Sequence, residues 1–214
     1  IQNNRIGGVS YVDGTPAIPN EIGISIFGQA SGNIIGATMA DIDQASILTS
    51  ANYIENNAIA LYVHGLGSNK NTIRGNRFRN NTTIGIDLYP QSGVTENDTG
   101  DTDSGANDFQ NFPVLTSVKS VGTSTRVVGT LNSLPNANYL IDLYVLESGE
   151  AHASGHGGAT YLLSAFWVGT DASGNASFDV TVPNYQTQPG QLVTATATSS
   201  TGSTSEFGAN AAIT

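Results

Sequence analysis

The residues best suited to chemistry lie in one acidic segment near the middle of the chain. Residues 96–108 hold five carboxylates and two asparagines, separated by threonine, serine and glycine. Calcium takes about six to eight oxygen ligands from a flexible loop, so alternating oxygen donors around a turn suit it. We expect Asp101, Asp103 and Asp108 to hold calcium, with Asp98 as a further ligand, and no other cofactor. The alternative is a solvated acidic linker.

Carboxylates elsewhere give weaker indications of catalysis. Asp87 is expected on the outer face of a strand beside Tyr62, as a solvated residue. One carboxylate falls short of the two, about 5 to 9 Å apart, that glycoside hydrolysis requires. Glu55 and Arg79 occupy equivalent positions of two repeats, where an exposed salt bridge is a better explanation than proton abstraction. We therefore assign no catalytic residue and do not expect an enzyme in this chain alone.

Two further groups of side chains could bind a ligand. His152 and His156, near Glu150, would share a metal only on a helix, which the surrounding glycines exclude, so we expect a hairpin tip. Tyr161 and Trp167 fall on one face of a predicted strand. Exposed, that pair could stack on a sugar ring, but we favour a place in the core.

A repeat in the first part of the chain must position many of these residues. Asn52 and Asn76 each begin a segment of the form Asn-x-apolar-x-Asn-Asn and are 76 − 52 = 24 positions apart, and Asn4 begins the similar segment Asn-x-apolar-Gly-Gly. Periods in the twenties made of short strands predict a solenoid whose coils bury apolar residues against one another. The predicted interior columns are Ile6, Ile54 and Phe78, and Ile24, Leu61 and Ile86.

Asparagine suits the corners of such coils, because it tolerates left-handed backbone angles and its amide can hydrogen-bond from coil to coil. Segments 32–36, 71–76 and 84–88 closely resemble the right-handed parallel β-helix repeats of the pectate-lyase-like superfamily. The resemblance implies β-helix coils over residues 1–92. It implies no single function, since the superfamily includes lyases, hydrolases, epimerases, phage tailspikes and non-catalytic surface proteins.

After residue 92 the repeat stops and longer strands with alternating apolar residues follow. We expect an all-β chain in which 93–112 form an acidic linker and 113–214 an immunoglobulin-like antiparallel β-sandwich of about seven strands, the last near 203–213. Segments 129–136, 170–178 and 194–198 resemble a C-terminal module that follows a β-helix in large bacterial secreted proteins. That resemblance implies a structural or adhesive role.

Composition restricts the partners and the location. The net charge of −10 disfavours nucleic acid and anionic membranes, and no stretch approaches the roughly 20 apolar residues of a membrane span. The chain has no cysteine, which is compatible with an extracellular protein stabilised by packing. Because residue 1 lies inside a repeat, we expect an open coil edge through which truncated chains could dimerise.

We expect a non-catalytic stalk, spacer or capping module of a large secreted or cell-surface bacterial protein. Glycans or other cell-surface components are the expected partners. Two alternatives remain open from the sequence. One is the C-terminal part of a polysaccharide lyase, hydrolase or epimerase, and the other is a carbohydrate-binding module.

Overall fold

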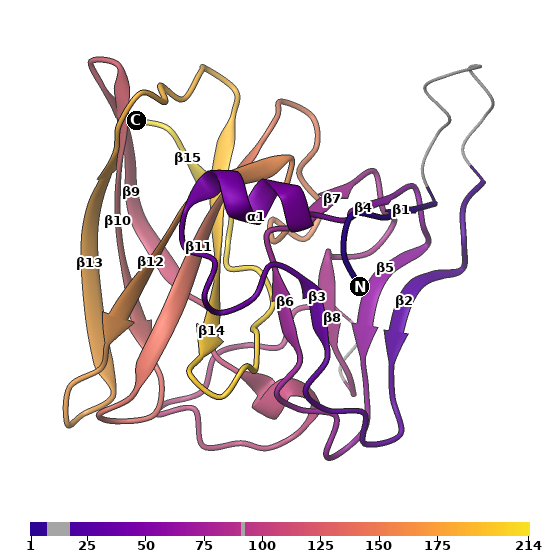
Figure 1. The fold of residues 1–214 in the computed structure, drawn as a ribbon. Helices are drawn as coiled ribbons and strands as arrows, with labels where there is room; N and C mark the ends of the chain where they lie inside the picture. Colours follow the sequence, from indigo (N-terminus) through magenta and orange to yellow (C-terminus); the bar gives the residue numbers. More distant parts are fainter. Residues whose placement is uncertain (8–17, 91–92) are drawn as a thin grey trace.

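The structure is a computed structural model that describes residues 1–7, 18–90 and 93–214. Parallel sheets stacked like β-helix coils are followed by antiparallel sheets that form a sandwich, which confirms the predicted fold class (Figure 1). Among the described residues, no helix is long and apolar enough to cross a membrane.

Three parallel sheets make up the coil region. The first contains β1 (Arg5–Ile6), β4 (Tyr53–Glu55) and β7 (Arg77–Arg79), the second β2 (Ile22–Ile26), β5 (Ile59–Val63) and β8 (Ile86–Leu88), and the third β3 (Ile34–Gly36) and β6 (Thr72–Arg74). Ile54 is in register with Ile6 and Phe78, and Leu61 with Ile24 and Ile86. Both predicted columns are therefore confirmed, and they line one hydrophobic core.

Asparagine ladders join the coils at three corners. Asn52 accepts two hydrogen bonds on Oδ1 from the backbone N–H and Nδ2 of Asn4, and donates the same two to Asn76 Oδ1, at 2.8 to 3.1 Å. The second ladder runs through Asn20, Asn57 and Asn81, and the third through Asn33, Asn71 and Asn107. The middle asparagine of each ladder is thus hydrogen-bonded to the asparagine before it and to the one after it. Such bonds from coil to coil are what the sequence predicts for stacked corners.

A short helix, α1 (Gln44–Ser50), interrupts the repeat between β3 and β4. Asp43 caps its N-terminus by accepting a 2.9 Å bond from the Ser46 N–H, and Ile47 is fully buried. The repeat does not predict this helix, because Asn4 and Asn52 are 52 − 4 = 48 positions apart, which is two periods. In the structure β1 pairs directly with β4, so these asparagines belong to adjacent coils and the helix occupies part of the interval.

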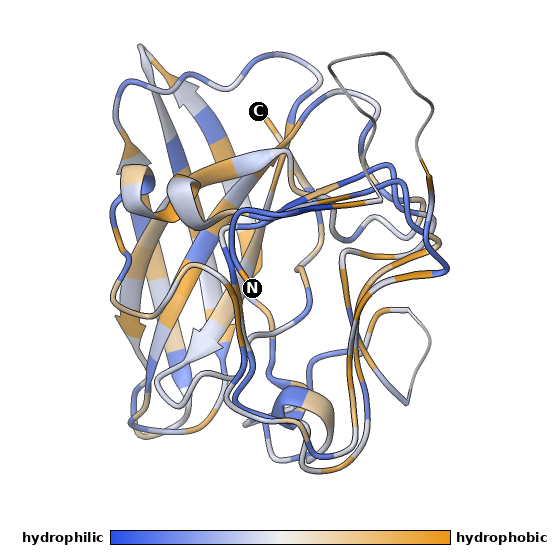
Figure 2. Cartoon of the chain, turned by 45° about the vertical axis from the view of Figure 1, so that its right-hand side comes forward, coloured by the Kyte–Doolittle hydropathy of each residue, from blue (hydrophilic) through white to orange (hydrophobic). Residues whose placement is uncertain are grey.

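The sandwich consists of two antiparallel sheets around a second core. One sheet contains β9 (Val114–Val121), β10 (Ser124–Asn132) and β13 (Asn175–Val182), and the other β11 (Asn138–Leu146), β12 (Tyr161–Gly169), β14 (Leu192–Ser199) and β15 (Ala211–Ala212). Burial alternates along β10, and hydrophobic and hydrophilic segments alternate along the sandwich strands in Figure 2.

Strands β11 and β14 of the second sheet are covered on both faces. Apart from its first residue, β11 is buried along its whole length, and the threonines of β14 are buried as well as its alanines. The cause is the coil stack, whose last coil packs on the face opposite the sandwich core. Phe207 lies with its ring centroid 5.5 Å from Phe78 and 5.3 Å from Tyr144, closing the interior of the last coil.

The seventh strand is much shorter than the sequence predicts. Of the interval 203–213, only β15 is a strand, whereas residues 203–207 are buried beside the coils. This segment still bonds to β14, since the Ser205 N–H donates to the Ala197 carbonyl and the Gly208 N–H to the Ala195 carbonyl, each at 2.9 Å. Its side chains at the same time contact the coils, as Thr204 does with the Ile73 N–H.

Candidate functional site

The most developed polar site lies where the sandwich meets the last strands of the coils. Each parallel sheet ends in an edge strand whose N–H groups would lack a partner. Side-chain oxygens of the sandwich accept hydrogen bonds from these N–H groups. The Ile73 N–H donates to Thr204 Oγ1 at 2.9 Å. The Gly75 N–H donates to the Tyr144 hydroxyl, and the Leu88 N–H to Glu206 Oε1, each at 2.8 Å.

Neighbouring amides are paired in the same way. Lys70 N–H donates to Ser203 Oγ at 2.9 Å, and Phe78 exchanges two backbone bonds with Ala159. We call the contact formed by Tyr144, Ala159, Ser203, Thr204 and Glu206 the cap. Its acceptors come from three separate segments of the sandwich, so it forms only when the sandwich is folded.

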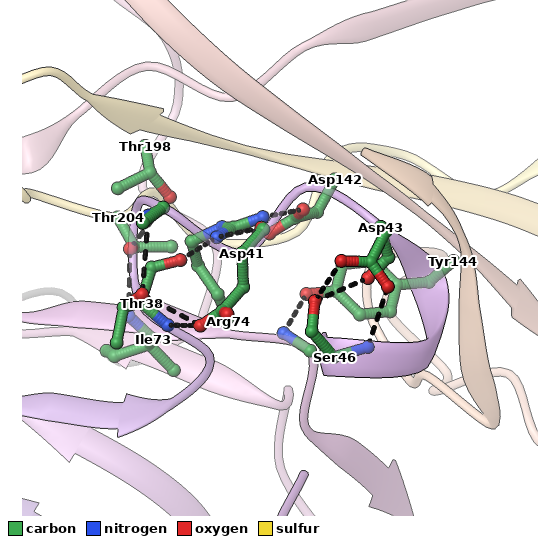
Figure 3. A network of polar contacts seen from close by, with 12 residues as sticks. Thr38, Asp41, Asp43, Ser46, Ile73, Arg74, Asp142, Tyr144, Thr198 and Thr204 are labelled. Atoms are coloured by element: carbon green, nitrogen blue, oxygen red, sulfur yellow. Dashed lines mark hydrogen bonds and ion pairs between the residues drawn. The ribbon is translucent and has the colours of Figure 1, made fainter. Parts of the chain in front are cut away.

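A buried ion pair fixes the cap to the coils (Figure 3). Arg74 of β6 donates to both carboxylate oxygens of Asp142 of β11, at 2.8 Å from Nε and 2.7 Å from Nη2, and neither side chain is exposed. Arg74 Nη1 also donates to the backbone carbonyls of Thr38 and Asp41. A bidentate pair with further hydrogen bonds is the geometry that makes burial of two charges tolerable.

Glu206 supplies the carboxyl group of the cap. Its carboxylate accepts N–H bonds from Leu88 and Thr95, each 2.8 Å long, and is 1% exposed. Burial raises its pKa to about 8, and the negative charge of Asp87 nearby raises this pKa further. The two N–H bonds act in the opposite direction and lower the pKa.

The acidic segment forms a separate cluster beside β10. One carboxylate oxygen from each of Asp98, Asp101 and Asp103 lies within 4.8 Å of the others. Asn111 and Asn132 fix this loop, since Asn111 Nδ2 donates to the Asp98 carbonyl at 2.7 Å and the Gly100 N–H donates to Asn132 Oδ1 at 2.8 Å. The cluster could hold a metal ion such as calcium.

Asp101 is the buried member of the cluster. Its carboxylate accepts bonds from the Asn111 N–H at 3.0 Å, from Gln110 Nε2 at 2.7 Å and from the Ser133 hydroxyl. Burial raises its pKa to about 6, and the charges of Asp98 and Asp103 add to the shift. Partial burial and Asp98 also raise the pKa of Asp103. A cation would oppose each of these shifts.

Asp108 lies apart from this cluster. Its carboxylate accepts bonds from Asn69 Nδ2 at 3.1 Å and from Ser203 Oγ at 2.6 Å, which places it at the contact between coils and sandwich. The cause is a left-handed turn: Asn107, Asp108 and Phe109 have φ angles of 48°, 59° and 48°. That turn directs Asn107 into the third asparagine ladder and Asp108 away from Asp101.

Residues of the outer coil surface differ from expectation in their burial. Asp87 is in register with Tyr62 but only 3% exposed, so it is not a solvated residue. Glu55 and Arg79 are in register, as the repeat predicts. Arg79 forms its salt bridge with Glu150 of the sandwich, and Glu55 is buried with Arg5 at 3.9 Å.

The structure also tests the predictions for two other groups of side chains, the histidines at 152 and 156 and the aromatic residues of β12. His152 and His156 lie outside any helix, and each ring contacts a backbone carbonyl, of Thr82 and Phe207 respectively. Tyr161 packs against the sandwich core, whereas Trp167 is 45% exposed. A register shift in the pairing of β11 with β12 breaks the alternation between them, so the prediction of a shared face was wrong.

Sequence reasoning missed the cap and the Arg74–Asp142 pair. A signal was present, because Asp142 is the one charge within the apolar run of β11. A lone charge in a strand that is otherwise apolar requires a partner from elsewhere in the fold.

No protein-family model matches the chain, and no curated protein matches it in sequence.

Proposed function

We propose that this chain is a non-catalytic structural module in which the sandwich caps the end of a β-helix-like rod. The rod and its cap would serve as a stalk or spacer of a larger secreted or cell-surface bacterial protein. The single observation that carries the proposal is the pairing of the terminal amides of all three parallel sheets by the sandwich.

Two physical reasons support capping over a simple domain contact. An exposed sheet edge is a template for pairing with another chain, and the cap removes that template at the last coil. The sandwich also contributes to the apolar core of the coils, because its residues Tyr144, Ala159, Leu162 and Phe207 belong to the same hydrophobic cluster as Ile73, Phe78 and Ile86.

Removing two cap oxygens tests this role. In the Tyr144→Phe/Thr204→Val double variant, the buried N–H groups of Ile73 and Gly75 lose their partners while the packed volume is nearly kept. We expect the free energy of unfolding to fall by about 2–6 kcal/mol, at about 1–3 kcal/mol for each N–H. Hydrogen exchange at these two amides should become faster than in the sandwich core. Light scattering should also show self-association that increases with protein concentration.

Thr116→Val is the matched control, because the Thr116 hydroxyl is exposed and bonds only within the sandwich, to the Val128 carbonyl. It should leave stability and association almost unchanged. Unaltered exchange at Ile73 and Gly75 in the double variant would contradict the capping role.

We further propose that the Asp98–Asp101–Asp103 cluster binds calcium and stiffens the segment between rod and sandwich. The support is the convergence of three carboxylates, one of them buried with a raised pKa, in a loop fixed by asparagines. The set differs from the one expected from sequence in that Asp108 is absent from it, whereas Asp98, which was expected as a further ligand, belongs to it.

Calcium should raise the melting temperature at pH 7.5, since a ligand of the folded state stabilises by mass action, by about 2.7 kcal/mol at a hundredfold excess over Kd. For a chain of this length that corresponds to about 5–11 °C. Asp101→Asn/Asp103→Asn should abolish the calcium effect in a thermal melt. Asp108→Asn should retain it, and a melting temperature indifferent to chelator in the wild type would reject the site.

A further inference from the structure

Strand β12 forms one edge of the second sandwich sheet, whose strand order is β12–β11–β14–β15. An edge strand carries a row of N–H and C=O groups without partners in its own sheet. Among the described residues, Gln44 of α1 gives the one hydrogen bond to this row, from Nε2 to the Leu162 carbonyl at 2.8 Å. Strand β12 runs away from α1 in Figure 1, so the part from Ser164 to Gly169 is left open.

The other edges of the sandwich are protected against pairing. Strand β13 carries the exposed charge of Asp179 near its middle, β9 is bridged to Ile213, and β15 has two residues. Charges, covering segments and short length are means by which edge strands avoid joining another chain. Strand β12 has nine residues with no charge and no proline among them, and its register shift lies at the end near α1, where it meets Leu143 and Tyr144.

The open part of β12 presents a large and a small side chain on one face. In the pairing with β11, Ala165 lies opposite Asp142 and Trp167 opposite Leu140, and residues two apart on a strand share a face. Ala165 packs partly against the core of the coils, whereas Trp167 is 45% exposed. An exposed tryptophan therefore stands next to a small residue at an unpaired edge.

We propose that β12 pairs antiparallel with β12 of a second copy of this chain, so that the second sheets of the two copies become one continuous sheet. With the two-fold axis at Phe166, Trp167 lies opposite Ala165 of the second copy, and Ser164 lies opposite Val168. Each tryptophan then covers the small residue of the other copy. Both contacts form at once, because a two-fold interface uses the same surface of both copies.

Charge favours a second copy at this edge over a charged partner. The chain has a net charge of −10, so two copies repel each other wherever acidic side chains meet. Residues Tyr161–Gly169 include no charged side chain, so self-pairing brings no like charges opposite each other. A basic or acidic peptide would find no complementary charge on the strand.

The open edge of the first coil is the other surface at which two copies could meet. It is divided among β1, β2 and β3, which have two, five and three residues. A second copy would have to match these short strands together, whereas β12 offers six consecutive residues in regular pairing with β11. Self-pairing of β12 is independent of the capping role, because the cap lies at the last coil.

The test is dimerisation of the whole chain in chelator, measured by sedimentation equilibrium and by the emission of Trp167, the one tryptophan of the chain. Two paired strands make a small interface, so we expect a Kd of about 100 µM or tighter. The Trp167 emission should shift to shorter wavelength with the same midpoint, because its ring leaves water as the dimer forms. Hydrogen exchange at residues 165–168 should become slower over the same concentration range.

Trp167→Lys should weaken dimerisation about tenfold or more, because it removes the apolar contact and places two positive charges near the axis. Val121→Lys is the matched control, because Val121 is 52% exposed and lies on β9. Ile22→Lys places the same charge at the open coil edge. All three substitutions change the net charge equally, and the last two should leave the Kd unchanged.

Three results would overturn the proposal. The first is a chain that stays monomeric at about 1 mM. The second is a dimer that is abolished by Ile22→Lys rather than by Trp167→Lys. The third is a doubling of the mass while the Trp167 emission stays constant.

Discussion

The Asp142→Ala substitution is expected to lower the free energy of unfolding by about 3–5 kcal/mol, as removal of one partner from a buried ion pair does. Arg74 would keep its charge at a position with no exposure, bonded only to the Thr38 and Asp41 carbonyls. Urea unfolding followed by circular dichroism measures the change. Because Asp142 belongs to the sandwich and Arg74 to the coils, the coils should unfold at a lower urea concentration together with the sandwich.

A second arginine–aspartate pair provides the control. Arg126 and Asp179 also form a bidentate contact, but their side chains are 48% and 50% exposed. Asp179→Ala should therefore lower the free energy of unfolding far less than Asp142→Ala does, because solvent screens the exposed pair. Equal effects of the two substitutions would show that the buried pair contributes no more than a surface pair.

The Glu206→Ala substitution is expected to cost about 2–6 kcal/mol, because the N–H groups of Leu88 and Thr95 would both lose their acceptor, at about 1–3 kcal/mol each. Glu206→Gln should cost less, since the amide oxygen can still accept one of the two bonds. Equilibrium unfolding of both variants at pH 5 would give this order. A Gln variant less stable than the Ala variant would contradict the assigned contacts.

Glu206 also makes stability depend on pH. Its folded pKa of about 8 is above the ordinary value of 4.5, so the folded state binds the proton more tightly than the unfolded state does. The contribution is fully present below pH 4.5 and is lost as the pH rises through 8. We expect the melting temperature to fall between pH 5 and pH 8.5 in chelator, and Glu206→Gln to flatten that profile. Asp101, with its pKa of about 6, acts in the same direction over the lower part of this range.

The sequence predicts the coil region well because its signal is periodic. Each interior residue contacts its equivalent in the next coil, so the column of Ile54 and Phe78 can be found from spacing alone. Helix α1 interrupts the period, and its sequence contains no repeated segment that would mark the interruption. The capping residues Asp43 and Ser46 indicate a helix only once the interval between β3 and β4 is known to contain an insertion.

The contact between the two regions is different, because its partners are far apart in sequence. Arg74 and Asp142 are 68 positions apart, and Leu88 and Glu206 are 118 apart, with no repeat to relate them. The position of Asp108 was equally inaccessible, since it depends on three consecutive left-handed residues that composition alone does not specify. The sequence predicts part of the acidic cluster. Asp101 and Asp103 are only two positions apart, so their carboxylates can lie close together whatever the rest of the fold is.

The asparagine ladders have a direction, and this affects how such a rod can change its length over evolutionary time. In the bonds between side chains, Asn4 donates to Asn52 Oδ1 and Asn52 donates to Asn76 Oδ1, from one coil toward the cap. A duplicated coil with asparagine at its three corners would be a donor to the coil after it and an acceptor for the coil before it. Gene duplication could therefore lengthen or shorten the rod by whole coils while the cap and its contacts were inherited unchanged.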